Sequence, residues 1–313
     1  MRTSRSTRRE ASFREAVVPV RAPYRLDLTA VVLRRLSTNV VDVFDGATYR
    51  RLLGDPAAPV RFSARQVAPD ALGIRLEGPG ADAFDPEAVA RRALGTEVDL
   101  SAFYEGAKTV PWLQTIATAA RGVKPPRYPS LWETICNAVV YQQVSIHAAG
   151  AILRRVIERY ACAVEADGAR LSPFPEPRTL LEANPVELRG LGLSVNKINA
   201  LSAVGAALES GDLDESRLDR LPTPQLLEAL VAHKGIGPWT AAVVALRGFG
   251  RLDVFPMKDS GVAAALRTFS GDATTEAEPI IEALRPQQGM LYYHLLLGRL
   301  NATGEISLRD PAV

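Results

Sequence analysis

The segment LVAHKGIGPWTAA, residues 230–242, most constrains what this chain can fold into. Before its glycines, residues 225–231 carry apolar side chains at helical spacing, and Thr223 and Pro224 supply an N-cap and a first-turn proline. After the glycines, Pro238 is typical of the first turn of a second helix. The sequence therefore predicts two helices joined by a tight turn, which is a helix-hairpin-helix.

The turn itself, Gly235-Ile236-Gly237, could bind a phosphate group through its main chain. Glycine permits the positive φ that a tight reversal needs, and the missing Cβ lets a polyanion approach closely. The free N–H groups at the start of the second helix face the same point, together with the positive end of the helix dipole. Such a contact holds nucleic acid without reading its sequence. An ordinary helical turn with a glycine C-cap is the alternative interpretation.

Length and composition fit a soluble globular protein of two or three modules. Of the 313 residues, 47% are hydrophobic and 23% are charged, and the formal net charge is only +2. A nucleic-acid surface would therefore need local clustering of basic side chains. The two cysteines, Cys136 and Cys162, cannot build a disulfide framework or a four-thiolate cluster. No apolar run approaches the ~20 residues of a membrane span and no secretory signal is evident, so we expect a cytoplasmic protein without membrane contact.

The composition and hydrophobic pattern of the sequence change along the chain, and these changes predict its domains. Residues 1–20 begin with a basic stretch poor in apolar residues, whereas 40–44, 60–67 and 72–76 are apolar or alternating runs separated by turn residues. Beyond the proline-rich segment 124–129 the patterns are helical. We expect a mainly α protein with a basic disordered tail (1–20), a small α+β amino-terminal domain containing an antiparallel sheet (21–99), a connecting helix and proline-rich linker (100–128), a helix-hairpin-helix domain (129–302) and a second tail (303–313).

Motifs downstream of the turn make it part of a larger pattern. An extended DVFP segment, residues 253–256, follows the second helix, and Asp259 lies 20 residues after Trp239. The succession of GIGPWTA, DVFP and this aspartate resembles the helix-hairpin-helix, glycine/proline-rich, aspartate (HhH-GPD) superfamily of DNA glycosylases, in particular its bacterial 3-methyladenine DNA glycosylase II group. The resemblance covers residues 129–300 and, more loosely, 23–99. It implies a helical bundle in two lobes that flips damaged bases out of double-stranded DNA.

The resemblance assigns the chemistry to Asp259. Hydrolysis of an N-glycosidic bond passes through an oxocarbenium-like sugar, which a nearby carboxylate stabilises. Asp259 could also position the attacking water, and it can cap the following helix while doing so. Bifunctional members of the superfamily carry a nucleophilic lysine where this chain has Trp239, and Lys234 lies on the wrong side of the turn. We therefore expect a monofunctional enzyme without lyase activity.

Four positions align with residues around the flipped base. Trp239 matches an aromatic position that could stack on a cationic purine such as 3-methyladenine, and Tyr292 borders the point where the family closes its pocket. Val243 and Gln287 stand where relatives have aromatic residues, for which Tyr292 or Trp112 could compensate. A less aromatic pocket with an added amide would favour a neutral, hydrogen-bonded lesion.

The remaining predicted DNA contacts lie in two other turns. Gln142 and Gln143, within YQQVS, resemble the segment that enters the duplex gap left by the extruded nucleotide, with Gln143 as the wedge. Ser194 and Lys197 resemble a point where the family's backbone approaches a phosphate. A solvated helix residue is the alternative for Lys197.

Relatives also hold a monovalent cation at the hairpin, which implies a structural Na⁺ or K⁺ on the backbone carbonyls of Val231, His233 and Ile236. We expect no other cofactor, because the four-cysteine iron–sulfur motif is missing and no His/Cys/carboxylate cluster indicates zinc.

Three hypotheses about function follow. The first is a monofunctional glycosylase of base excision repair that removes alkylated purines and acts as a monomer on the DNA of the nucleoid. The second is a glycosylase of the same architecture for oxidised or deaminated bases. The third is a non-enzymatic helix-hairpin-helix DNA-binding protein, which Asp259 and Gln143 disfavour.

Overall fold

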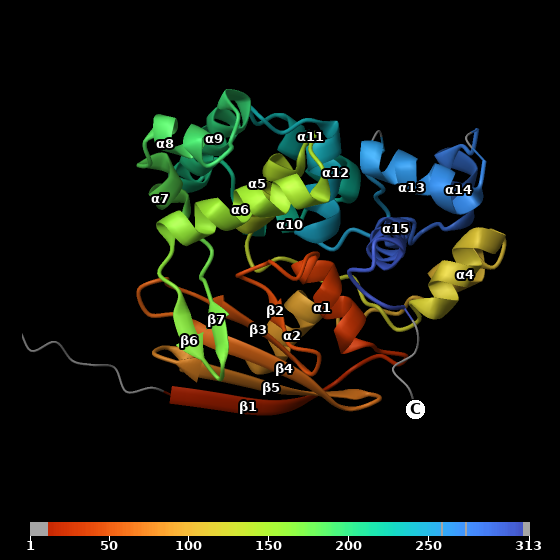
Figure 1. Ribbon diagram of the computed structural model, residues 1–313, viewed down its shortest axis with the longest axis horizontal. Coiled ribbons are helices and arrows are strands. Elements are labelled where there is room, and N and C mark those ends of the chain that lie inside the picture. The colour runs from red at the N-terminus through yellow and green to blue at the C-terminus, as the bar shows by residue number, and fades with distance from the viewer. Residues whose placement is uncertain (1–11, 258, 273, 309–313) are drawn as a thin grey trace, which may run out of the picture.

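The chain folds into a β-sheet layer with helices stacked on one side of it (Figure 1). The computed structural model describes residues 12–257, 259–272 and 274–308. Within these ranges no helix combines enough length with enough apolar character for a membrane crossing. The strands are β1 (Ser12–Pro19), β2 (Val43–Phe44), β3 (Thr48–Leu53), β4 (Val60–Ala68), β5 (Ala71–Gly78), β6 (Val164–Ala166) and β7 (Ala169–Leu171). The helices are α1 (Leu26–Arg34), α2 (Pro86–Leu94), α3 (Ser101–Ala107), α4 (Pro111–Ala119), α5 (Leu131–Tyr141), α6 (Ile146–Tyr160), α7 (Pro177–Leu181), α8 (Pro185–Gly190), α9 (Val195–Ser210), α10 (Glu215–Asp219), α11 (Thr223–Val231), α12 (Pro238–Arg247), α13 (Ser260–Ser270), α14 (Ala277–Ala283) and α15 (Gly289–Ala302), with a short 3-10 helix at Ala81–Ala83.

The first five strands form an antiparallel sheet in the order β1-β5-β4-β3-β2. Val60, Phe62 and Ala64 alternate along β4 and are buried, and helices α1 and α2 pack apolar side chains against the same face. A strand whose side chains alternate with a period of two presents one apolar face in this way. The predicted mainly α fold with a small antiparallel sheet is confirmed.

Strand β1 corrects the prediction that residues 1–20 form a disordered tail. Residues 12–19 pair with β5 along the whole strand. Val18 is buried in the core while its neighbour Val17 is 70% exposed, so this segment alternates between faces although its surroundings are rich in arginine. Such an edge strand is difficult to predict from composition, because only one of its faces is apolar. Residues 1–11 lie outside the described part of the chain.

Strand β3 was not predicted, because two arginines interrupt its apolar pattern. The structure shows why one of them is tolerated. Arg51 is 1% exposed and forms ion pairs with Asp42 at 2.9 Å and with Glu133 of α5 at 2.7 Å. This buried cation therefore connects the sheet to the helix that leads into the candidate site.

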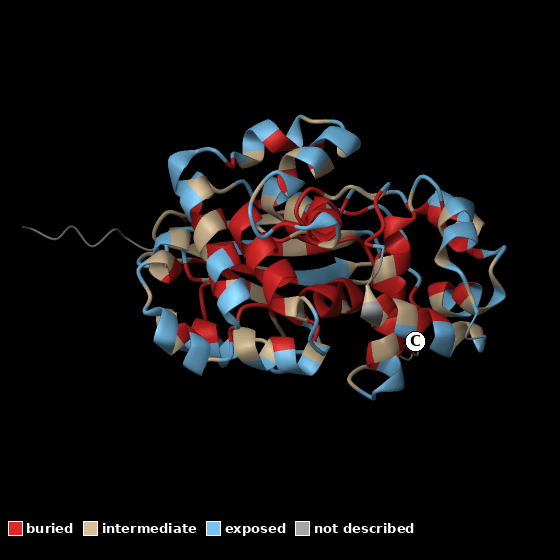
Figure 2. Ribbon diagram, turned by 90° about the horizontal axis from the view of Figure 1, so that it is seen from above, coloured by how far each residue is buried: buried red, intermediate tan, exposed pale blue. Residues whose placement is uncertain are grey.

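The helices form two lobes, each with its own apolar core. One core contains α5, α6, α9, α11 and α12, and the second contains α13, α15 and both α3 and α4. Residues 100–128, predicted as one connecting helix and a linker, thus contribute two packed helices. Helix α1 reaches into the second core with Leu28, Val31 and Val32 while its other face covers the sheet. Figure 2 shows buried residues gathered in the middle of the molecule and exposed ones around its rim.

The predicted helix-hairpin-helix is present as α11 and α12. Helix α11 ends at Val231 and α12 begins at Pro238, as the sequence indicates. The N-cap of α11 is Pro222, one position before the predicted Thr223, which is already helical.

The two glycines of the hairpin have different roles. Gly235 has a φ of 93°, and a Cβ there would lie 2.5 Å from the Cβ of Ala200 on α9, so both conformation and packing require glycine. Gly237 has an ordinary φ of −85°, and no atom lies within 4 Å of where its Cβ would be. Ile236, buried between them, anchors the turn. The hairpin therefore presents the main chain of Gly237 to open space.

Candidate active site

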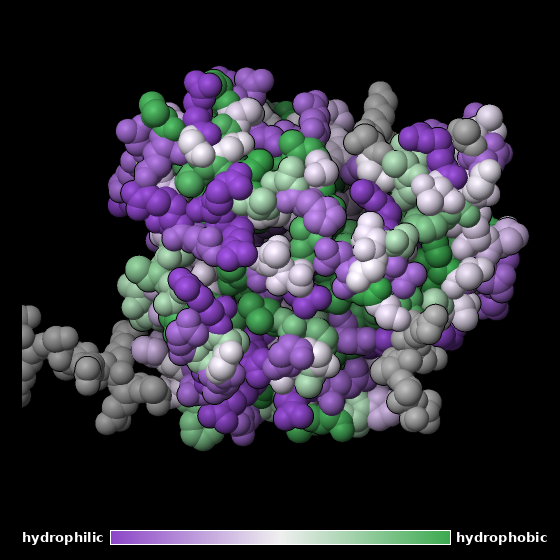
Figure 3. All heavy atoms as spheres, viewed as in Figure 1, coloured by the Kyte–Doolittle hydropathy of each residue, from purple (hydrophilic) through white to green (hydrophobic). Residues whose placement is uncertain are grey.

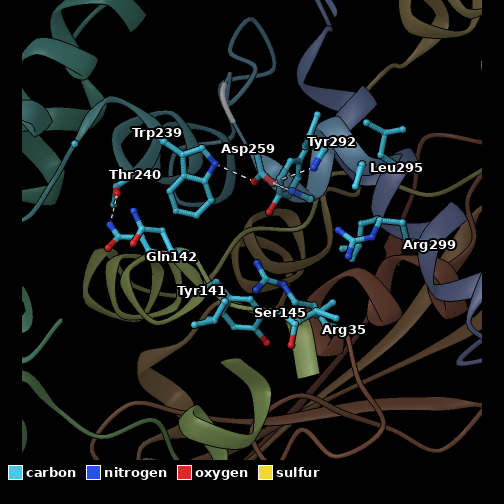
Figure 4. A pocket seen from close by; sticks show the side chains of 18 of the residues that line it. Arg35, Tyr141, Gln142, Ser145, Trp239, Thr240, Asp259, Tyr292, Leu295 and Arg299 are labelled. Atoms are coloured by element: carbon cyan, nitrogen blue, oxygen red, sulfur yellow. Dashed lines mark hydrogen bonds between the residues drawn. The ribbon is translucent and has the colours of Figure 1, made fainter. Parts of the chain in front are cut away.

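A cleft of about 910 Å³ opens where the two helical lobes meet. Its walls are the turn between α5 and α6, the start of α12, and parts of α13 and α15. Six residues that the sequence predicts as functional line it together, as Figure 4 shows for four of them: Gln142, Gln143, Gly237, Trp239, Asp259 and Tyr292. Segments distant in the sequence therefore converge on one cavity.

Asp259 is the N-cap of α13 and also faces the cleft. Its Oδ1 accepts hydrogen bonds from the main-chain N–H groups of Gly261 at 2.7 Å and Val262 at 3.0 Å. Its Oδ2 accepts a bond from Nε1 of Trp239 at 2.9 Å (Figure 4). Three donors therefore hold the carboxylate in one orientation, and capping the helix does not compete with a role in the cleft.

The two glutamines in the turn between α5 and α6 have different surroundings. Gln142 is the C-cap of α5, and its Nε2 donates to Oγ1 of Thr240 at 2.6 Å, which ties the turn to the first turn of α12. Gln143 is exposed and has a φ of 56°. Ser145 caps α6 by accepting a bond from the N–H of Ala148. Gln142 thus holds the turn in place, whereas the side chain of Gln143 is exposed to solvent.

Lys197 has a structural partner that the sequence did not indicate. Its Nζ donates to the carbonyl oxygen of Val140 at 2.7 Å, near the end of α5. Partial burial lowers the pKa of this amine. Ser194 accepts a bond from the N–H of Lys197 and caps α9. The structure thus gives both predicted phosphate contacts a structural role, and Lys197 supports the turn that carries Gln143.

The surface over α6 to α9 is strongly hydrophilic (Figure 3). Three of its arginines are paired with carboxylates: Arg154 with Glu158 at 2.8 Å, Arg159 with Glu187, and Arg178 with Glu182 at 3.6 Å. Such pairs leave little net charge, so this surface is less suited to phosphates than the main chain of the hairpin.

Two residues predicted for the base pocket do not line the cleft. Val243 is 3% exposed and packs in the core of the first lobe, because α12 is buried on all sides beyond its first turn. Gln287 lies in the segment before α15, where its Nε2 donates to the carbonyl of Asp99 at 2.6 Å and its Oε1 accepts from the N–H of Phe103 at 2.9 Å. Its amide therefore serves the start of α3 and not a bound base.

Of the two aromatic residues predicted to compensate, Tyr292 lines the cleft and Trp112 does not. The Trp112 ring stacks on Phe269, with ring centroids 6.5 Å apart, and packs against the second core. The predicted compensation by Tyr292 is consistent with this geometry, whereas that by Trp112 is wrong.

Arg35, Tyr141 and Arg299 also line the cleft and were not predicted. Arg35 follows the last residue of α1, and Arg299 lies on α15 beside Gly261. Their positions depend on packing between distant helices, which no local motif records. The only sequence feature that could have drawn attention to Arg35 is the pair of arginines at the end of an apolar helix.

No group of three or more His, Cys, Asp or Glu side chains within the described ranges is arranged to hold a metal ion. Any ion at the hairpin would depend on main-chain oxygens.

Comparison with known proteins gives this arrangement a family. Residues 136–286 match the model of the HhH-GPD superfamily base excision DNA repair protein. The chain is 27% identical over 169 residues to the DNA-3-methyladenine glycosylase of Bacillus subtilis (strain 168). The matched region covers 54% of this chain and 56% of that protein. The chain is 31% identical over 284 residues to the probable bifunctional transcriptional activator/DNA repair enzyme AlkA of Mycobacterium tuberculosis (strain ATCC 25618 / H37Rv), covering 89% of this chain and 55% of that protein. The chain therefore spans little more than half the length of these relatives.

Solved structures show the same fold. The 3-methyladenine DNA-glycosylase from Archaeoglobus fulgidus superimposes with a TM-score of 0.72 over 91% of this chain and 98% of that one. The sequence identity is 22%, so this likeness concerns the fold alone.

Proposed function

Because residues 136–286 match the model of the HhH-GPD superfamily of base excision DNA repair proteins, we propose that this chain is a monofunctional DNA glycosylase. It flips damaged bases, chiefly alkylated purines, out of duplex DNA and hydrolyses their N-glycosidic bonds. The observation that carries the proposal is the single cleft shared by Asp259, Trp239 and the turn that bears Gln143. The relatives named as 3-methyladenine glycosylases support the class of lesion.

Asp259 would stabilise the transition state electrostatically. As the base departs, positive charge develops on the sugar, and a fixed carboxylate close to it lowers the barrier without having to reorient. The three N–H groups that hold both oxygens provide that fixed orientation. An N-alkylated purine leaves as a neutral base, so the reaction needs no general acid. The same carboxylate can orient the water that attacks C1′.

Trp239 and Tyr292 would bind the extruded base. An aromatic face attracts a cationic alkylpurine and excludes water from it. Flipping costs a few kcal/mol and costs least for damaged pairs, so the lesion itself contributes to selection.

Duplex DNA would be held by the hairpin and opened by the α5–α6 turn. Pro238 has no N–H, but the N–H groups of Gly237 and Trp239 beside it donate no main-chain hydrogen bond in the described chain and can bind a phosphate at the positive end of the helix dipole. Gln143 would fill the gap and hydrogen-bond the orphaned partner base. This arrangement is complete within one chain, so we propose a monomer acting on nucleoid DNA in the cytoplasm.

A monovalent cation, Na⁺ or K⁺, would strengthen the hairpin contact. In the described chain no main-chain hydrogen bond ends on the carbonyl oxygens of Val231 or Ile236, and that of His233 accepts one from the N–H of Ile236 at 3.1 Å. A carbonyl has two lone pairs, so all three oxygens can face an ion. The bound ion would supply positive charge toward a phosphate.

Duplexes that each carry one defined lesion test the proposal, with base release and the cleaved strand measured separately. Release of 7-methylguanine with the strand left intact is expected, and the Asp259→Asn variant is the inactive control. Release confined to oxidised or deaminated bases would replace the substrate class. Tight binding without release from any lesion would make the protein a non-enzymatic DNA-binding protein.

A further inference from the structure

Three non-glycine residues of the described chain have a positive φ, and two of them, Arg35 and Gln143, line the same cleft. Gln143 belongs to the turn that approaches DNA. Arg35 has a φ of 58° and a ψ of −69°, a conformation that residues with a side chain rarely adopt. Such conformations persist where the surroundings enforce them, and they cluster at functional sites. The backbone of Arg35 therefore points to a role within the cleft.

Arg35 is held rigidly against one wall. It is 4% exposed, and its own N–H donates to the carbonyl of Val31 at the end of α1. The central carbon of its guanidinium lies 3.9 Å from the centroid of the Tyr141 ring, in cation–π contact. Figure 4 shows Arg35 and Tyr141 on the side of the cleft opposite Trp239 and Asp259. A base between the two walls would meet Trp239 on one side and the guanidinium on the other.

Among the residues that the structure describes, the guanidinium of Arg35 has no anionic partner. Among the described ion pairs none involves Arg35. The charged residues described in the cleft wall are Arg35, Arg299 and Asp259, so this wall carries more positive than negative charge. Stacking on Tyr141 covers one face of the guanidinium. Its N–H groups, which lie in the plane, are suited to a hydrogen-bond acceptor on the ligand.

We propose that Arg35 determines specificity by donating a hydrogen bond to the carbonyl oxygen at C6 of the extruded purine. The cleft then selects 6-oxopurines, such as methylated guanines, over 6-aminopurines, such as methylated adenines. A 6-amino group presents N–H donors and offers the buried guanidinium no acceptor at that position, which is costly. Arginine recognises guanine through O6 and N7 in the same manner within DNA grooves. This inference rests on the proposed function and adds the class of purine to it.

DNA treated with dimethyl sulfate provides the test, because it contains 3-methyl and 7-methyl forms of both adenine and guanine. The full-length protein and the Arg35→Met variant are incubated with this DNA, and the four released bases are quantified by chromatography. Each oxo-to-amino ratio is taken between purines methylated at the same position and corrected for spontaneous release. We expect each ratio to fall about tenfold in Arg35→Met, which keeps the length and apolar stem of the side chain.

Two further variants sharpen the result. Arg154→Met removes an exposed arginine of α6 that is paired with Glu158 and lies outside the cleft, so its ratios should match those of the unmodified protein. Arg35→Lys keeps the charge but loses the planar donor edge, so its ratios should lie between the other two. Unchanged ratios in Arg35→Met, with base release intact, would overturn the role of Arg35 alone. A complete lack of release by the unmodified protein would instead contradict the proposed function.

If Arg35→Met does not fold, a measurement on the unmodified protein tests whether the cleft selects 6-oxopurines. Free hypoxanthine and free adenine differ at C6 and compete for the cleft during release of 7-methylguanine. Hypoxanthine should inhibit about tenfold more strongly than adenine. Equal inhibition by the two bases would refute the selection of 6-oxopurines.

Discussion

Nε1 of Trp239 donates a hydrogen bond to Oδ2 of Asp259 at 2.9 Å, and this bond spans the cleft between the two helical lobes. Trp239 begins the second helix of the hairpin, whereas Asp259 begins α13 in the other lobe. The residue that replaces a nucleophilic lysine thus orients the carboxylate. Trp239 is therefore expected to act in two ways, through its N–H on Asp259 and through its ring on the base.

Substitutions at Trp239 should separate these two roles. Trp239→Phe keeps an aromatic ring and removes only the hydrogen bond, so base excision should slow by about tenfold or more, since bonds to charged groups contribute about 1.5–3 kcal/mol. Trp239→Ala should slow it further for cationic 7-methylguanine, by up to about 2 kcal/mol of lost ring contact. For neutral hypoxanthine the gap between the variants should be smaller. Single-turnover rates on both lesions measure this, and equal effects of the two variants on both would contradict it.

Asp259→Asn should abolish most excision while sparing the fold. Asparagine is as good an N-cap as aspartate, so α13 and the thermal midpoint of unfolding should be nearly unchanged. The lost negative charge should reduce the rate by about 10²–10³. DNA affinity should stay within a few-fold, because a carboxylate repels phosphate in the ground state. Parallel loss of binding and turnover would show that Asp259 mainly maintains the structure.

The stability of the second lobe should fall in mild acid because of His294. Burial lowers the pKa of this imidazole to about 4, and its ring stacks on Phe103 with Nδ1 bonded to the carbonyl of Met290. The unfolded chain binds a proton near pH 6.5 and the folded chain does not. The free energy of unfolding should therefore decrease as pH falls from about 6.5 toward 4, by about 1.4 kcal/mol per pKa unit of difference.

His294→Phe provides the comparison, since it keeps the stack and cannot titrate. Chemical denaturation at several pH values should show a shallower acid dependence for this variant than for the unmodified protein. Identical pH profiles would mean that folding leaves the pKa of His294 unchanged.

The sequence predicted the parts of the site that depend on local chemistry. A glycine turn, a first-turn proline and an N-cap aspartate each need particular residue types at fixed spacing, so the hairpin and Asp259 could be found without the structure. The edge strand β1 could not, because its pattern extends over few residues and lies beside a basic segment. Strand β3 could not be predicted either, because Arg51 interrupts its apolar pattern. The burial of Arg51 depends on its ion pairs with Asp42 and Glu133.

Predictions of the pocket failed where packing decides the outcome. Val243 was assigned by alignment to a base-contacting position, but α12 enters the core after its first turn and carries it away from the cleft. Gln287 was assigned in the same way, and its amide is used by α3. The sequence does not predict that Arg35 lines the cleft, because its neighbour Tyr141 lies on a helix far along the chain. The aromatic and charged content of the wall follows from how helices distant in the sequence meet, and no short motif encodes that.

We expect no lyase activity, because of where the amines lie relative to the cleft. A covalent imine needs a lysine amine within reach of C1′, and none of the described residues in the cleft wall is a lysine. Lys234 is exposed on the hairpin, before Gly235, and Lys258 lies outside the described residues. Borohydride added during turnover should therefore trap no protein–DNA adduct, and the product should be an intact strand with an abasic site. An adduct with the unmodified protein would refute the monofunctional assignment, and mapping the modified lysine would then show whether Lys234 or Lys258 reaches the sugar.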